Sequence, residues 1–572
     1  MTWRKEILVL ALYGALTLLM TMPLLANITT HVAGAGGDPW QTMWRFEDSV
    51  RVFSAERLFG GGEARLVNLS VWPWIGLHAL FGQPLAYNIV WLLSFVLSGY
   101  FMFLLARYLT KHETASFLAG IFYMFLPFHV AHSLGHFGAM QMQWIPLAIL
   151  LLFLFFKRPT IWRTLGLTLV LVMQSWTEHH YFLWLVIFAG LFYLIRPFGA
   201  TSPSKGEVPL LTKERSAAYG GRARLPGVVQ YYVLLVFLLF FFVVLPWVPT
   251  MKLAFQPGSG LELGKEQTIR FSADVFSFVA PPQWQPIWGG VFHELLGKHF
   301  TGNAAEATQF LGWVPLLLII FFFKSVPRKQ AVFWTTIAAV FALIALGPRL
   351  HVFGNVLPVP LPYDLLGGLP VFSSVRAVAR AGVMVGAAVS ILFAWILANK
   401  MAKRRWSALI VGAVILIEFL WLPIPLQSTE LSRAYDLIAE LPGKRLVEIP
   451  AATNYTVASR ALYASLIHGK EVVGNIALER AEGDEELKRL RSTPGLRWLI
   501  FARPQSLLNA PEDFGQDVAG AVREGLAKLD VHVIAVHSEV MSGPDAFALT
   551  RWLENTMGLV PEAFDGVLVY RL

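Results

Sequence analysis

The best candidate for chemistry in this chain is an aspartate in a glycine-rich loop that follows the first apolar segment. Asp38 comes after Gly36 and Gly37 and before Pro39 and Trp40. Because proline disfavours the helical conformation in the residue before it and glycines allow tight turns, we expect Asp38 to lie at a bend. Such an acid could take a proton from a hydroxyl group. The structural alternative is an N-capping aspartate for a helix that begins near Trp40.

Histidines and a second acid lie at the ends of other apolar segments. His129, His132 and His136 are spaced i, i+3 and i+7, so they would share one face if the helix of that segment continued. Glu178 and His179 lie at a polar break between two further segments. Ionisable groups near a membrane are costly and suggest function, although single side chains there can simply reach headgroups and water.

Two kinds of chemistry are open to these residues. Imidazole and carboxylate ligands suit Mn, Zn or Fe, so Asp38, Glu178 and His179 are candidate ligands for a divalent metal. The alternative is direct acid–base catalysis. In this case Asp38 takes the proton of an acceptor hydroxyl, and Glu178 or a histidine orients or protonates the reacting substrate. We assign no other cofactor. The chain contains no cysteine, which excludes disulfides, thiolate metal sites and cysteine nucleophiles.

Two arginines precede a late apolar segment. Arg376 and Arg380 follow a proline-containing stretch, residues 359–372, in a predicted outer loop, where positive charge is unexpected. Arginine makes fork-like contacts with phosphate, and a helix start adds backbone donors. We therefore predict that they bind a lipid-linked phosphate, with anchoring of the helix end at headgroups as the alternative.

The composition requires that membrane helices position these groups. Of the 572 residues, 56% are hydrophobic and only 15% are charged, and the mean hydropathy is +0.56; these values are typical of a polytopic membrane protein. We attribute the net charge of +9 to loops that contact membrane lipids, not to nucleic-acid binding. About eleven helical spans are predicted, at residues 6–26, 84–106, 116–133, 139–156, 164–177, 181–196, 227–249, 309–323, 330–347, 380–399 and 406–424.

Basic residues gather in alternate connections between these spans, which predicts a cytoplasmic N-terminus. The connections concerned contain residues 4–5, 107–111, 157–163, 205–224, 324–329 and 400–405. A transmembrane domain over residues 1–425 then has outer loops at 27–83, 250–308 and 348–379, and the remainder of the chain, residues 426–572, is extracytoplasmic. The first span is longer than the apolar core of a signal peptide, so we expect it to be retained.

Residues 426–572 have the composition of a small α/β domain. Short β-type runs are predicted at 445–449, 497–501, 532–536 and 567–570, and helices at 485–491 and 518–529. No glycine-rich phosphate loop follows any of these strands, so we expect no nucleotide site there. We expect this domain to cap or support the membrane part and to cover its active cavity.

The order of these motifs resembles that of the GT-C superfamily of integral membrane glycosyltransferases. Its members take a sugar from a polyprenyl phosphate or pyrophosphate on the non-cytoplasmic face and use an acid in the first outer loop, here within residues 36–40. More closely, the chain is similar to the YfhO-like membrane glycosyltransferase group. The further matching segments are residues 131–136, 143–146, 361–370 and 375–380.

This resemblance implies a GT-C-like membrane fold that is mainly α, with Asp38 as base or metal-linked acid and Arg376 or Arg380 on the donor phosphate. Two features depart from the superfamily pattern. The next acids after Asp38, at 47 and 48, lie about three helical turns later, and histidines stand where oligosaccharyltransferase-type members have an acidic pair. The predicted site comprises Asp38 and Glu178 as catalytic residues and, for substrate binding, Arg376, Arg380, His132, His136, His179 and Trp40.

The predicted function is inverting transfer of a sugar from a polyprenyl-phosphate-linked donor to a lipid, glycan or protein acceptor at the outer face of the cytoplasmic membrane, a cell-envelope glycosylation. One alternative is a lipid-carrier flippase or transporter, which would place charges in mid-membrane within broken helices or inverted repeats. The other is a non-catalytic assembly protein that acts through its outer C-terminal domain. The sequence names neither the sugar nor the oligomeric state.

Overall fold

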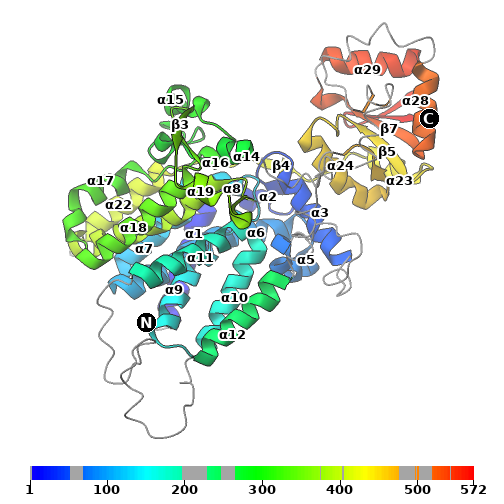
Figure 1. The fold of residues 1–572 in the computed structure, drawn as a ribbon. Helices are drawn as coiled ribbons and strands as arrows, with labels where there is room; N and C mark the ends of the chain where they lie inside the picture. Colours follow the sequence, from blue (N-terminus) through cyan, green and yellow to red (C-terminus); the bar gives the residue numbers. More distant parts are fainter. Residues whose placement is uncertain are drawn as a thin grey trace.

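The computed structural model describes residues 3–51, 69–195, 229–245, 265–373, 375–401, 405–475, 496, 499–500, 518–541 and 543–572. These residues form a mainly helical body followed by a C-terminal part that contains a five-stranded sheet (Figure 1). The predicted basic loop at 205–224 and the predicted helix at 485–491 lie outside the described residues. So does most of the strand predicted at 497–501, and its two described residues, 499–500, are helical.

A helix is present within each of the eleven apolar segments predicted to span the membrane. The helices that form them are α1 (Trp3–Met20), α6 (Leu85–Thr110), α7 (Glu113–Met124) with α8 (Pro127–Ser133), α9 (Trp144–Lys157), α10 (Ile161–Thr177), α11 (His179–Ile195), α12 (Val229–Leu239), α17 (Trp313–Phe322), α18 (Arg328–Ala345), α21 (Gly382–Ile396) and α22 (Arg405–Glu418).

Far fewer than eleven of these helices are long enough to cross a membrane unaided. Among the described residues, the segments Leu85–Thr110, Arg328–Ala345 and Val378–Lys400 meet the length and composition required, and α7 with α8, bent by 42°, would make a fourth. Most of the others are apolar helices of 10–17 residues. The chain therefore has the helices of a membrane protein, while the count of eleven spans stays a prediction.

Shorter elements fill the segments predicted as outer loops. They are α2 (Leu24–Asn27), β1 (His31–Ala33), α3 (Asp38–Arg51), η1 (Leu69–Trp74), α5 (Ile75–Phe81), α14 (Lys265–Arg270), α15 (Gly289–Leu295), α16 (Ala304–Ala307), β2 (Arg349–Val352), β3 (Asn355–Pro360), α19 (Tyr363–Leu366), α20 (Pro370–Ser373) and η7 (Val378–Ala381). Strands β2 and β3 form an antiparallel hairpin.

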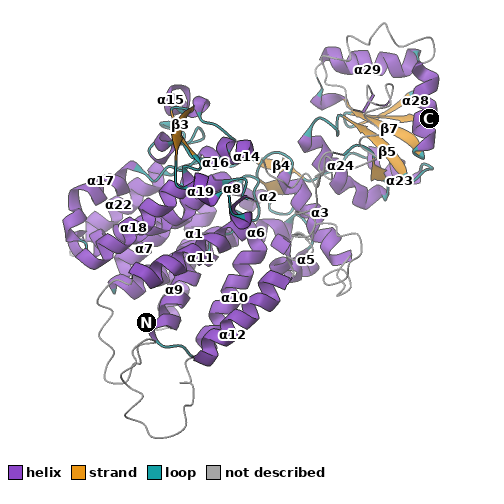
Figure 2. Cartoon of the chain, in the orientation of Figure 1, coloured by secondary structure: helices purple, strands orange, loops and turns teal. Residues whose placement is uncertain are grey.

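The C-terminal sheet has the strand order β6-β5-β7-β9-β8, and Figure 2 shows its strands between helices. Strand β5 is parallel to β6 and β7, whereas β9 is antiparallel to β7 and β8. The elements are β5 (Arg445–Ile449), β6 (Glu471–Val472), β7 (Val531–His537), β8 (Pro561–Phe564), β9 (Val567–Arg571), α23 (Ala434–Glu440), α24 (Tyr455–His468), α28 (Val518–Lys528) and α29 (Gly543–Asn555). The strands predicted at 445–449, 532–536 and 567–570 and the helix predicted at 518–529 are confirmed within one residue at each end.

Helices cover both faces of this sheet. Along β7, Val533 and Ala535 pack with α23 and α24, whereas Ile534 and Val536 pack with α28 and α29. Successive side chains of a strand point to opposite faces, so one apolar run supplies two cores.

The C-terminal part is attached to the first predicted outer loop. Strand β4 (Leu426–Ser428) pairs antiparallel with β1 instead of joining the five-stranded sheet. Helix α24 packs against α3, and both labels lie close together in Figure 1. This attachment brings a surface of the sheet domain to the loop that holds Asp38.

Candidate functional site

Asp38 is the first residue of helix α3, so the expectation that Pro39 keeps it at a non-helical bend is wrong. The amide of Gln41 donates to the carbonyl oxygen of Gly37 at 3.0 Å, which makes Pro39 part of the first helical turn. The amide that proline lacks would have had no helical partner there, and proline is therefore well tolerated at this position.

The Asp38 carboxylate has one occupied and one open side. The hydroxyl of Tyr455 donates to Oδ1 at 2.7 Å, whereas Oδ2 lies 3.9 Å from Nε2 of His136. A Cβ atom at Gly135 would come within 3.2 Å of Oδ2, so the glycine keeps this side uncrowded. The side chain is 36% exposed. The carboxylate is therefore partly accessible from solvent.

A second glycine allows the C-terminal part to reach this site. A Cβ atom at Gly37 would lie 2.6 Å from the carbonyl oxygen of Tyr455 and 2.6 Å from Oγ of Ser459. Only a residue without a side chain lets α24 approach the loop this closely. The C-terminal domain, which the sequence predicts to cover the active cavity, thus contributes Tyr455 to the surroundings of Asp38.

His132 and His136 form a contacting pair, and His129 does not join them. Pro127 begins α8 after the 42° bend that follows α7. The Nδ1 atoms of His132 and His136 are 2.9 Å apart, with one ring donating to the other. His129 instead stacks on Phe95 at 4.2 Å. The expectation of three histidines on one helical face is wrong: α8 ends at Ser133, so the helix does not continue to His136, and His129 packs on Phe95 away from the other two.

Arg380 lies between two buried acids that come from distant parts of the chain. Its Nη1 donates to Glu178 Oε2 at 3.1 Å, and its Nε and Nη2 donate to Glu306 Oε1 at 3.0 and 2.8 Å. Glu178 occupies the break between α10 and α11, where His180 also hydrogen-bonds to its carboxylate. Glu306 lies on the short helix α16.

The electrostatics keep both acids ionised. Burial raises the pKa of the Glu178 carboxyl group, but Arg380 and His180 outweigh this effect and hold it well below its usual value. Burial also raises the pKa of the Glu306 carboxyl group. The charges of Arg380 and the nearby histidines outweigh this effect, so the pKa lies below its usual value. The arginine is thus held by two carboxylates.

Contacts between these residues are continuous from Asp38 to Glu178. Beyond the Asp38–His136 contact, His136 Nδ1 lies 3.9 Å from Glu306 Oε1, and His132 Nε2 lies 3.8 Å from Glu306 Oε2. We call this set the outer polar cluster, after the outer face that the sequence predicts for it. Its members are Asp38, His132, His136, Glu178, Glu306 and Arg380.

Glu306 is the member that sequence reasoning missed. It stands in an alanine-rich stretch, and Asn303 three residues earlier accepts a hydrogen bond from its amide at 2.9 Å. Asparagine followed three residues later by glutamate is the signature of a helix start, so the local signal favours a capping role. Only the fold brings this acid to Arg380.

The remaining predicted site residues lie at the margin of the cluster or face other groups. The guanidinium of Arg376 lies 5.0 Å over the ring of Phe271. Trp40 donates from Nε1 to Gln427 at 3.1 Å and is buried. His179 is 54% exposed, with Nδ1 4.0 Å from Glu178 Oε1.

Among the residues that the structure describes, two groups have the spacing needed to hold a metal ion. One ligand atom from each of three residues lies within 4.8 Å of the others in both groups, which are His132 with His136 and Glu306, and Glu178 with His179 and His180. Asp38, a predicted metal candidate, belongs to neither group and contacts the first through His136.

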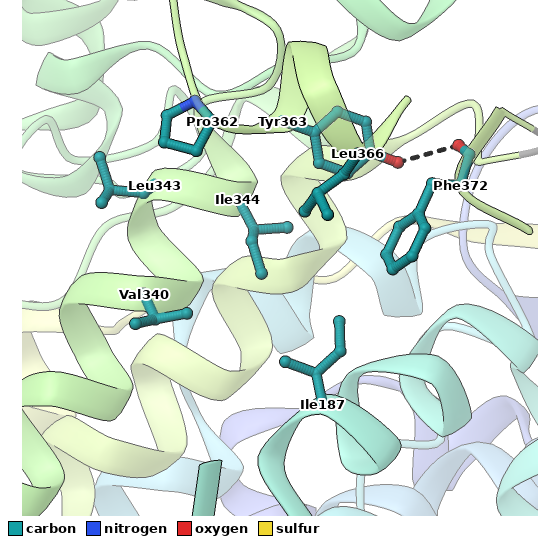
Figure 3. A pocket seen from close by; sticks show the side chains of 8 residues that line it. All are labelled: Ile187, Val340, Leu343, Ile344, Pro362, Tyr363, Leu366 and Phe372. Carbon is teal, nitrogen blue, oxygen red and sulfur yellow. Dashed lines mark hydrogen bonds between the residues drawn. The ribbon is translucent and has the colours of Figure 1, made fainter. Parts of the chain in front are cut away.

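An apolar cavity of about 310 Å³ lies between helix α18 and the segment 362–372, and Ile187 of α11, the helix that begins next to Glu178, closes one side (Figure 3). The hydroxyl of Tyr363 donates to the carbonyl oxygen of Phe372 at 3.0 Å, so this polar group is satisfied in the wall. Ile187 is nine residues after Glu178, roughly 13 Å along the helix. The cavity is lined by Ile187, Val340, Leu343, Ile344, Pro362, Tyr363, Leu366 and Phe372.

Solved membrane glycosyltransferases have similar structures. The arabinofuranosyltransferase AftD from Mycobacteria matches with a TM-score of 0.57 and 11% identity, over 100% of this chain and 40% of AftD. ArnT from Cupriavidus metallidurans bound to undecaprenyl phosphate matches with a TM-score of 0.44 and 12% identity, over 100% and 98%. The Archaeoglobus fulgidus oligosaccharyltransferase matches with a TM-score of 0.38 and 12% identity, over 98% and 73%.

The likeness to AftD shows a shared fold, and this chain spans less than half the length of AftD. No curated protein matches the sequence, and the resemblance to the YfhO-like group stays a prediction. A family model described as "Domain of unknown function (DUF6311)" matches residues 76–419, more than half of the sequence, and the chain belongs to this family.

Proposed function

We propose that this protein is a membrane glycosyltransferase that moves a sugar from a polyprenyl-phosphate-linked donor to a lipid, glycan or protein acceptor. The observation that carries the proposal is the outer polar cluster. Its acids, histidines and arginine come from segments that are far apart in the sequence and meet within a GT-C-type fold. The basic connections of the sequence favour the outer face of the cytoplasmic membrane for this cluster.

In this reaction Asp38 is the base. Its Oδ2 accepts the proton of the acceptor hydroxyl while the acceptor oxygen bonds to the anomeric carbon. The bond from that carbon to the phosphate oxygen breaks, and its electron pair leaves with the phosphate. Phosphate is a good leaving group, so a single carboxylate suffices and no general acid is needed. Tyr455, which donates to Oδ1, holds the carboxylate in place.

Arg380 is the proposed contact to the donor phosphate. A guanidinium has five N–H donors, and three of those of Arg380 are directed to Glu178 and Glu306. The other two remain for phosphate oxygens, and the two acids fix their direction. Glu178 is then a positioning residue for Arg380, since both of its carboxylate oxygens are directed to protein groups.

The apolar cavity suits the prenyl chain of such a donor. Its walls are aliphatic and aromatic, and Ile187 of the helix that begins beside Glu178 closes one side. A lipid with its phosphate near Arg380 would place apolar carbons along α11, where their burial is favourable by about 0.8 kcal/mol for each CH₂ group.

The test is sugar transfer by the purified full-length chain in lipid nanodiscs. Radiolabelled polyprenyl-phosphate sugars are supplied together with a membrane extract as the source of acceptors. The wild type is compared with Asp38→Asn and with Asp48→Asn, a matched control on the same helix. We expect transfer by the wild type and the control and a loss of at least a hundredfold, on the order expected for a general base, with Asp38→Asn.

Transfer that survives Asp38→Asn undiminished would refute the assignment of the base. If no donor is used, but labelled lipid crosses the bilayer of reconstituted vesicles, the protein is a transporter instead.

A further inference from the structure

Two buried polar atoms in the outer polar cluster face each other without a hydrogen-bond partner among the described residues. They are Nε2 of His132 and Oε2 of Glu306, which lie 3.8 Å apart. Their side chains are 0% and 2% exposed, so water does not satisfy them from outside. An unsatisfied buried polar atom costs about 1–3 kcal/mol, and two such atoms directed at one another indicate a missing ligand between them.

A third donor stands beside this pair. The Nδ1 atom of His136 lies 3.9 Å from the other oxygen of Glu306, and ligand atoms of the three residues lie within 4.8 Å of one another. Ligands of a tetrahedral zinc ion, with Zn–N and Zn–O bonds of about 2.0–2.2 Å, are roughly 3.3 Å apart. A contraction of the three donors around one ion would also require the hydrogen bond between Nδ1 of His132 and Nδ1 of His136 to open, so that His136 Nδ1 could face the ion.

The charge of the cluster also favours a cation. The cluster holds three carboxylates, those of Asp38, Glu178 and Glu306, and one guanidinium, that of Arg380, which bonds to the last two. Three negative charges and one positive charge leave a formal charge of −2 when the histidines are neutral, and one divalent ion would balance it. Asp38 Oδ2 faces Nε2 of His136, the arrangement in which a carboxylate orients a metal-bound histidine from outside the first ring of ligands.

We propose that His132, His136 and Glu306 bind a divalent transition-metal ion, with zinc as the first candidate. Two imidazoles and one carboxylate match the preferences of Zn²⁺, whereas Mg²⁺ and Ca²⁺ require more oxygen ligands. Three protein ligands leave a fourth position open, as in catalytic zinc sites. This inference does not rest on the proposed sugar transfer, because it concerns binding of the metal alone.

The second group of potential ligands provides an internal control. Glu178 already bonds to Arg380 and His180, and His179 is more than half exposed. We therefore expect His179→Asn to bind metal as the wild type does, although it removes a histidine near the same acids.

The experiment measures metal binding by the full-length protein in detergent, without any substrate. The protein is stripped with a chelator and then titrated calorimetrically with Zn²⁺, and its bound metal is determined by mass spectrometry. The variants are His136→Asn, which alters a partly exposed side chain, Glu306→Gln, and the control His179→Asn. We expect about one ion per chain in the wild type and the control, and affinity more than tenfold weaker in the other two variants.

A spectrum of the Co²⁺-loaded wild type keeps the proposal testable even if a variant misfolds. Intense visible bands of four-coordinate cobalt are expected, and the weak bands of six-coordinate cobalt would overturn the proposal. It is also overturned if the wild type binds no ion, if His136→Asn and Glu306→Gln bind as tightly as the wild type, or if His179→Asn weakens binding equally. None of these results depends on whether sugar transfer is detected.

Discussion

Replacing Tyr455 with phenylalanine removes one hydroxyl group and leaves the ring that packs at the start of α24. That hydroxyl donates to Asp38 Oδ1 at 2.7 Å and also lies 3.1 Å from Oε1 of Gln41. A hydrogen bond to a charged group contributes about 1.5–3 kcal/mol when buried. Because Tyr455 is 38% exposed and Asp38 is 36% exposed, we place the contribution of this bond just below that range, at about 1.4 kcal/mol. If the bond holds the base in position during transfer, kcat/KM falls about tenfold.

The assay is the initial rate of sugar transfer by the full-length protein at several donor concentrations. Tyr463→Phe is the matched control, since Tyr463 lies on the same helix and packs its ring on Trp40 at 5.6 Å. The thermal midpoint is measured for both variants, so that a general loss of folding is recognised. Equal kcat/KM for Tyr455→Phe and the wild type would refute the reasoning, as would the same tenfold loss in the control.

Three further predictions concern docking, the cavity and the sheet domain. Gly37→Ala places a Cβ atom 2.6 Å from a backbone oxygen of α24. This overpacking costs about 1–3 kcal/mol and should lower the thermal midpoint of unfolding. An unchanged midpoint would contradict the close approach of α24 to Gly37. Ile187→Trp fills the apolar cavity. It should raise the KM severalfold for donors with a long prenyl chain but not for short-chain analogues. An equal rise in the KM of long-chain and short-chain donors would exclude the cavity as the prenyl site. Burial lowers the pKa of His537, but hydrogen bonds to Glu448 and Glu539 raise it to about 9. This raised pKa contributes about 3 kcal/mol to stability below pH 6.5, which is lost as the pH rises through 9. A fall in the protection factors of the β7 amides, taken relative to their intrinsic base-catalysed exchange rates, checks this loss across that window, and His537→Gln should abolish the fall.

Much of the fold could be predicted because its signals are local. Runs of apolar residues gave the positions of the helices, since a helix in an apolar environment satisfies its own backbone hydrogen bonds. The short β-type runs at 445–449 and 567–570 likewise became β5 and β9. Helix lengths were less predictable, because caps and turns shorten several apolar segments to 10–17 residues.

The candidate site was predictable only in its separate parts. Asp38, His132, His136, Glu178 and Arg380 drew notice because charged and ionisable residues are rare beside apolar segments. Local rules misplaced two features: Pro39 does not exclude Asp38 from a helix, and His129 turns toward Phe95 instead of joining its neighbours. Each outcome depends on packing around the residue and not on its spacing.

The sequence by itself determined a helical body rich in apolar segments, a C-terminal sheet domain and a short set of residues suited to acid–base, metal or phosphate chemistry. The tertiary structure alone decided that Glu306, from an alanine-rich loop, would meet Arg380 at 2.8 Å, and that Tyr455 would reach Asp38 from more than 400 residues away. The physical reason is the distance along the chain over which each kind of signal acts. Periodicity and turn preferences report on neighbours in the chain, whereas these contacts arise from the docking of distant elements, which no local pattern encodes.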